Sequence, residues 1–221
     1  LIKMTICRDG LVYLTSHQRF ERHYDDKSKV NYSNMRILLM KLSSNNQIER
    51  FIKGEYSQKS QQLTISKTLQ KGTYLVLVDF DWISPKNRHA VVSAYSAYRA
   101  ILEDINPTKL GGLQSIYRNI GLTYLSSFPS KVEAIRVYDD SRINSFLVNV
   151  KMKYGMYMLQ YVNDSESKLR VSVSLTLVGM KKCTGRRKFI LKPKEKETIV
   201  IKTDFPLLQP SANYQHEFKF I

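Results

Sequence analysis

One segment, residues 71–82, constrains the fold of this chain more than any other. After a turn at Gly72, apolar side chains occupy every second position from Tyr74 to Phe80. The positions between them change from leucine to aspartate: Leu75, Leu77, Asp79 and Asp81. One face of the segment is therefore apolar throughout, and the other becomes polar at its end. This pattern predicts a β-strand that is buried on both faces at its start and half-exposed at its end.

Most of the remaining periodicity also indicates β-structure. The cleanest alternation lies in Leu169–Val178, where every odd position from Leu169 to Leu177 is apolar and the residues between them are polar. Residues 163–167 (Asn-Asp-Ser-Glu-Ser) before it predict a hairpin loop. The other expected strands are two within 4–15 around a turn at Asp9-Gly10, and 35–42, 62–71, 90–95, 146–152, 154–162, 188–191 and 197–202.

One stretch has the period of a helix instead. Apolar residues from Leu110 to Ile120 form a single stripe, which predicts an amphipathic helix beginning near Pro107 and stopping at Gly121. With strands on both sides of this helix, the sequence predicts a mainly β fold. We expect two small antiparallel β-sandwich units joined by a short helical linker.

The charge is unusual for a globular chain. The 221 residues carry a formal net charge of +16, and residues 180–202 hold nine basic and two acidic residues, a net charge of +7. Eight of these basic residues, called the basic run below, are the candidate partner-binding residues: Lys181, Lys182, Arg186, Arg187, Lys188, Lys192, Lys194 and Lys196. They lie on a hairpin-like stretch between strands. Two interpretations stay open: a solvated sheet edge protected by lysine, or a contact for an anionic surface. Nucleic acid is disfavoured, because Phe189 is the one aromatic residue interleaved with the basic run.

Candidate catalytic and metal-binding groups are few. Cys7 and Cys183 lie far apart, which predicts two reduced thiols in a cytoplasmic protein, and the four histidines are too scattered for a zinc site. Asp79 and Asp81 could contribute to a calcium site, but calcium needs six or more oxygen ligands, so we favour a salt-bridged sheet edge. We predict no catalytic residues and no metal ligands in this sequence. No apolar stretch approaches the roughly 20 residues that span a bilayer.

Several of these segments resemble the non-catalytic C-terminal part of calpain-family cysteine proteases, of the divergent kind found in ciliates. The resemblance rests mainly on Lys71-Gly-Thr-Tyr through Asp81-Trp82 and on Val91–Tyr95, which are similar to the closing hairpin of the C2-like domain III. The other similar stretches are Thr5–Tyr13, Met35–Gln47, Tyr157–Val162, Asn163–Ser165, Val178–Met180 and Lys192–Lys202. The resemblance implies a tail from the protease domain (1–16), a first C2-like sandwich (17–98), a helical linker (99–130) and a second C2-like sandwich (131–221).

The catalytic segments of the family have no counterpart here, and neither does the acidic loop of domain III. The resemblance therefore implies a non-catalytic interaction or scaffolding module that docks on an acidic protein surface. A microtubule, in the cytoskeleton or a cilium, is one such surface. The alternative is the regulatory part of an active calpain-type protease that binds anionic membrane, with or without calcium. The chain does not begin with Met, and we expect it to be a piece of a longer protein.

Overall fold

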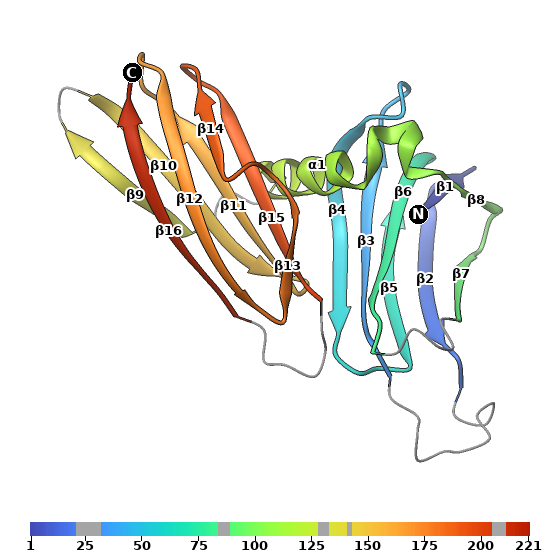
Figure 1. Cartoon of the computed structure of the whole chain (residues 1–221). Helices are drawn as coiled ribbons and strands as arrows, with labels where there is room; N and C mark the ends of the chain where they lie inside the picture. The colour runs from blue at the N-terminus through green and yellow to red at the C-terminus, as the bar shows by residue number, and fades with distance from the viewer. Residues whose placement is uncertain (21–31, 84–88, 128–132, 141–142, 205–210) are drawn as a thin grey trace. The chain divides into compact units, whose positions relative to one another are not determined.

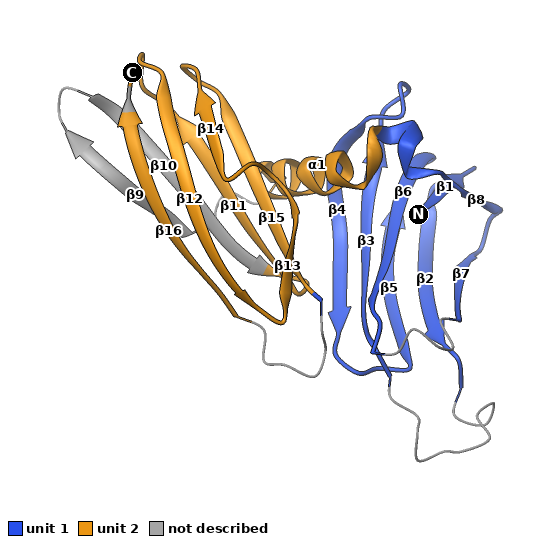
Figure 2. Ribbon diagram, in the orientation of Figure 1, with its two compact units in different colours: residues 1–110, 204–208 blue, residues 111–203, 209–221 orange. Residues whose placement is uncertain are grey.

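The protein is mainly β, with antiparallel sheets and one α-helix in the part that the structure describes (Figure 1). The computed structural model describes residues 1–20, 32–83, 89–127, 133–140, 143–204 and 211–221. The chain divides into two compact units, coloured separately in Figure 2. Unit 1 comprises Leu1–Leu110 and Asp204–Leu208, and unit 2 comprises Gly111–Thr203 and Gln209–Ile221.

Unit 1 is built from two antiparallel sheets. A five-stranded sheet has the order β4-β3-β6-β1-β8, and a three-stranded sheet has the order β5-β2-β7. Its strands are β1 (Ile2–Ile6), β2 (Gly10–Gln18), β3 (Asn34–Leu42), β4 (Ile48–Ser57), β5 (Gln62–Leu69), β6 (Gly72–Asp81), β7 (Ala90–Ser96) and β8 (Ala100–Asp104). A 3₁₀ helix, η3 (Pro107–Leu110), follows β8.

Side chains from both sheets of unit 1 share one hydrophobic core. The five-stranded sheet contributes residues such as Met4, Ile37 and Val76, and the three-stranded sheet contributes Leu14 and Ile65. Strand β6 lies inside its sheet between β3 and β1. On the opposite face of β6 the leucines are buried as well, so the predicted two-sided burial at the start of this strand is confirmed.

The aspartates at the end of β6 differ from the expectation of a sheet edge. Asp79 stands directly opposite Arg36 of β3, and Arg36 donates one hydrogen bond to each of Asp79 and Asp81. The Arg36 side chain is 1% exposed and that of Asp81 also 1%. The salt bridge is present, but it lies inside the sheet and not at its edge, because β3 pairs with β6 on this side.

The first strands are integral to unit 1. β1 pairs with both β6 and β8, and β2 pairs with both β5 and β7. Residues 1–16, expected as the tail of another domain, thus supply one strand to each sheet. The two sheets could not keep their observed strand order without them.

Unit 2 also has two antiparallel sheets, with the orders β13-β15-β11-β10-β9 and β14-β12-β16. Its strands are β9 (Glu133–Asp140), β10 (Ile143–Lys153), β11 (Met156–Asn163), β12 (Leu169–Val178), β13 (Met180–Thr184), β14 (Lys188–Leu191), β15 (Lys196–Thr203) and β16 (Ser211–Phe220). Leu159, Val171, Leu191 and Ile199 belong to a core that draws on both sheets. Residues 163–167 connect β11 to β12, which lie in different sheets, so the prediction of a hairpin loop there is wrong.

Helix α1 (Gly112–Ser127) packs against β15, β13 and β11 of unit 2. The segment expected as a linker therefore holds β8, which pairs in unit 1, and a helix that covers a sheet of unit 2. Gly121 does not end the helix as predicted, because α1 continues to Ser127. A Cβ atom at Gly121 would lie 2.7 Å from Cγ2 of Thr198, so glycine allows α1 to approach β15 closely. The helices in the described ranges are too short or too polar to cross a bilayer.

Candidate partner-binding surface

The basic run follows the chain from the edge of one sheet of unit 2 to the edge of the other. Strand β13 is an outer strand of the five-stranded sheet and β14 an outer strand of the three-stranded sheet. All eight residues of the basic run are exposed. The two strands do not pair with each other, so the expected hairpin-like arrangement is wrong: the basic run spans two sheet edges instead of one.

On β13, the first two lysines of the basic run lie between two buried residues that hold the strand in place. Met180 and Thr184 are buried, while Lys181 and Lys182 between them are exposed. The register with β15 shifts between Lys182 and Thr184, which is a β-bulge. A bulge on an edge strand twists the edge and hinders pairing with another chain.

After β13, a tight turn at Gly185 carries the chain to the second sheet. Gly185 has φ +90°, and a Cβ atom at this position would lie 2.9 Å from the Cα of Ile199 and 2.6 Å from Cγ1 of that residue. Its carbonyl accepts a hydrogen bond from Nζ of Lys182 (2.8 Å). The backbone N–H of Val173 on β12 then donates to the carbonyl of Arg187 (2.7 Å). Arg186 and Arg187 are thus held on a fixed backbone.

Asn163 fixes the second part of the basic run. Its side chain is fully buried, and Nδ2 donates to the carbonyls of Leu191 and Lys192, both at 3.1 Å. Its backbone carbonyl accepts from the N–H of Lys194 (2.7 Å), and its own N–H donates to the carbonyl of Glu195 (3.0 Å). One buried residue of β11 therefore orders the loop that presents Lys192 and Lys194.

The carboxylates near the basic run neutralise little of it. Nζ of Lys194 lies 3.6 Å from Glu166, and Glu197 accepts a hydrogen bond from Arg118 of α1 (3.0 Å). Five exposed cations have no ion-pair partner in the part of the chain that the structure describes: Arg186, Arg187, Lys188, Lys192 and Lys196. Ile190, which is 50% exposed, lies on β14 among them. A net positive surface with one apolar contact point results.

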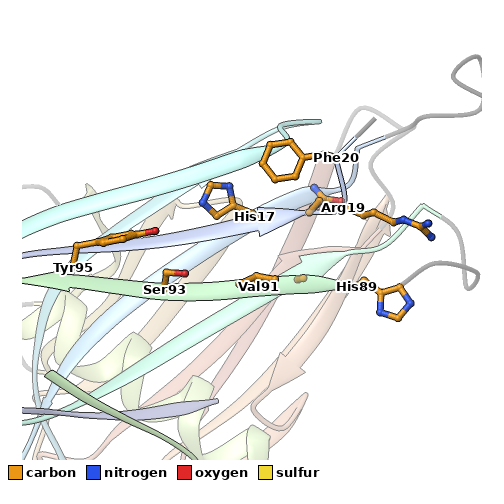
Figure 3. Close-up of a pocket in the computed structure, with 9 residues that line it drawn as sticks. His17, Arg19, Phe20, His89, Val91, Ser93 and Tyr95 are labelled. Carbon is orange, nitrogen blue, oxygen red and sulfur yellow. The ribbon is translucent and has the colours of Figure 1, made fainter. Parts of the chain in front are cut away.

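A second surface, which the sequence analysis missed, lies in unit 1 at the end of β2 and the start of β7. Here a pocket of about 360 Å³ is lined by His17, Gln18, Arg19, Phe20, His89, Ala90, Val91, Ser93 and Tyr95. Figure 3 shows Val91, Ser93 and Tyr95 in a row on one side of it. Nδ1 of His17 is buried and has no hydrogen-bond partner among the described residues. The sequence did contain a signal for this surface, because the predicted strand 90–95 has no charged residue.

A histidine of unit 2 has a pKa lowered by burial. His216 on β16 packs against Tyr161, whose hydroxyl lies 3.2 Å from Nδ1 of the imidazole. Burial lowers the pKa of His216 from its ordinary value and raises the pKa of the Tyr161 hydroxyl. Burial disfavours the charged form of each group. This pair therefore contributes to the core as two neutral groups at neutral pH.

The other sequence candidates are not brought together into a reactive site. Cys7 is exposed in unit 1, Cys183 is half-buried in unit 2, and neither forms a disulfide. Asp79 and Asp81 both accept hydrogen bonds from Arg36, so their oxygens face a cation of the protein. Within the described ranges, no three His, Cys, Asp or Glu side chains are grouped as metal ligands would be.

Comparisons with known proteins assign no family. No family model matches the chain, and no curated protein matches it either.

Proposed function

We propose that this chain is a non-catalytic interaction module of a calpain-like protein, built from two C2-like β-sandwiches, which docks through the basic run on an acidic protein surface. One observation carries the proposal: five exposed cations without ion-pair partners among the described residues stand on ordered backbone, on β14, in its two flanking connections and at the start of β15. Isolated surface lysines are common, but a cluster on fixed backbone creates a local field that attracts an anionic partner.

The ordered backbone favours a protein over a lipid surface. Asn163 and Gly185 fix the loops that carry these cations, so little loop entropy is lost on binding. Fixed charges complement a partner with fixed carboxylates, whereas lipid headgroups move freely. We further propose that docking needs no calcium, because Asp79 and Asp81 are bound to Arg36.

Charge removal tests the proposal. The docking variant replaces all five cations by Gln: Arg186, Arg187, Lys188, Lys192 and Lys196. The matched control removes the same charge from five exposed cations of unit 1: Arg50, Lys59, Lys67, Arg99 and Lys109. Each variant is sedimented with microtubules, as an acidic protein lattice, and with vesicles of phosphatidylcholine and phosphatidylserine, in calcium and in a chelator.

The docking variant should bind microtubules about tenfold more weakly than the control. Each exposed charge contributes a few tenths of a kcal/mol, and about 1.4 kcal/mol corresponds to a factor of ten. Equal losses in the two variants would mean that net charge alone matters, and the basic run would then be only a solvated edge. If the chain binds only the vesicles, and the docking variant loses this binding, the partner of the basic run is an anionic membrane and not a protein surface. Binding that needs calcium would refute the calcium-independent form.

A further inference from the structure

Strand β7 of unit 1 is an unprotected sheet edge. It is an outer strand of the sheet β5-β2-β7, and its pairing with β2 runs from Ala90 to Ser96 without a register shift. The described sheets have eight outer strands in all. Each of the other seven contains at least one charged residue, and β7 contains none. Natural sheets place charges, proline or bulges on an edge to prevent another strand from pairing with it.

Exposed apolar and aromatic side chains lie along the β7 edge. Val91 is 62% exposed and Tyr95 is 58% exposed. On β2, Tyr13 stands directly opposite Tyr95 and is 44% exposed. An extended segment added beside β7 would gain main-chain hydrogen bonds from the edge and apolar contacts from these side chains. The pocket beside Val91 offers a place for one bulky apolar side chain of that segment (Figure 3).

The charge around this edge selects the occupant. Strands β5, β2 and β7 contain no aspartate or glutamate. Arg19 and His89 line the pocket at the start of β7, and the whole chain carries a net charge of +16. Two copies of so basic a chain repel each other, whereas a segment with carboxylates is attracted.

From this geometry we propose that β7 accepts an extended acidic peptide segment of a partner protein as an added strand. A bulky apolar side chain of the segment occupies the pocket lined by Phe20, Val91 and Tyr95. Carboxylates beside it face Arg19 and His89, and a polar group of the segment can pair with Nδ1 of His17. This site lies in unit 1 and is separate from the basic run of unit 2.

The test selects a display library of random ten-residue peptides on the immobilised full chain. The selected peptides should be rich in Asp and Glu around one Leu, Ile or Phe. A labelled selected peptide is then titrated against wild type, Val91→Lys and the control Val178→Lys. Val178 is 46% exposed and lies on β12, which is not an outer strand, so this variant adds the same charge elsewhere.

Val91→Lys should weaken binding at least tenfold although it adds a charge attractive to the peptide, because it protects the edge and occupies the pocket. Val178→Lys should stay within about twofold of wild type. Methylation of the alternate backbone nitrogens that face β7 should abolish binding, since strand addition uses the N–H groups on that side of the peptide. This arm does not depend on any protein variant folding.

Three results would overturn the proposal. The library could give no enriched peptide, or peptides without acidic residues. The selected peptides could keep their affinity after backbone methylation or for Val91→Lys. The wild-type chain could sediment as a dimer that Val91→Lys dissociates, in which case the occupant of β7 is a second copy.

Discussion

Replacement of Arg36 by Met is the sharpest test of how unit 1 is held together. The substitution keeps an apolar stem of similar length and removes the charge. Asp81, whose side chain is 1% exposed, then lies in the sheet without its cation, close to the partly hydrated Asp79 (19% exposed). Removing one partner of a buried ion pair costs about 3–5 kcal/mol, because the remaining charge is uncompensated.

The assay is urea unfolding followed by tryptophan fluorescence. Trp82, the single tryptophan of the chain, stacks on Phe80 in unit 1, so its emission reports this unit. With an m-value of about 2 kcal/mol per M, a loss of about 4 kcal/mol lowers the unfolding midpoint by roughly 2 M. The matched control replaces the whole network with Arg36→Met, Asp79→Leu and Asp81→Leu.

The control should recover most of the lost stability, because a well-packed apolar set often equals or exceeds a buried ion pair. The prediction fails if Arg36→Met lowers the free energy of unfolding by less than about 1 kcal/mol. It fails equally if the triple variant is as unstable as the single one, since the cost would then come from lost packing around Arg36.

Two further predictions concern unit 2. Gly185→Ala should destabilise the unit by about 2 kcal/mol or more, since a left-handed backbone costs roughly 1–2 kcal/mol for alanine and the new Cβ meets the Ile199 backbone. The rate of amide hydrogen exchange in β13 and β15 should rise. An unchanged exchange rate would contradict the close contact at Gly185. Burial lowers the pKa of His216, so unfolding takes up a proton: this stability is fully present above the ordinary pKa of about 6.5 and is lost as the pH falls below it. Circular dichroism melts at pH 7.5 and 5.5 should show a drop that His216→Phe reduces, and an equal drop in both proteins would assign it to other groups.

The strands predicted correctly from the sequence are those in which buried and exposed positions match the alternation of apolar and polar residues. Leu169–Val178 and Lys188–Leu191 were placed at their observed bounds, as β12 and β14. Strand β16 was missed although Tyr214 and Phe218 alternate with polar residues. His216 stands at an inward position between them and breaks the apolar pattern. A pattern of apolar residues cannot identify buried positions that are occupied by polar residues which become neutral or paired inside the core.

The pairing of strands could not be predicted, because it depends on residues far apart in the sequence. The salt bridge at Asp79 and Asp81 was expected, but its cation, Arg36, is supplied by β3, more than forty positions away. Likewise, the charges of the basic run were evident in the sequence. Their division between two sheets follows from β13 pairing with β15 and β14 with β12. Local patterns cannot contain that information.

The division of the basic run between β13 and β14 has a consequence for biosynthesis. A folding intermediate with the five-stranded sheet formed and β14 still detached contains the same cations, but their spacing is not yet fixed. If the basic run docks as proposed, tight docking requires that both sheets have closed on their common core. Incorporation of the chain into an assembly would then act as a checkpoint, leaving incompletely folded copies unassembled.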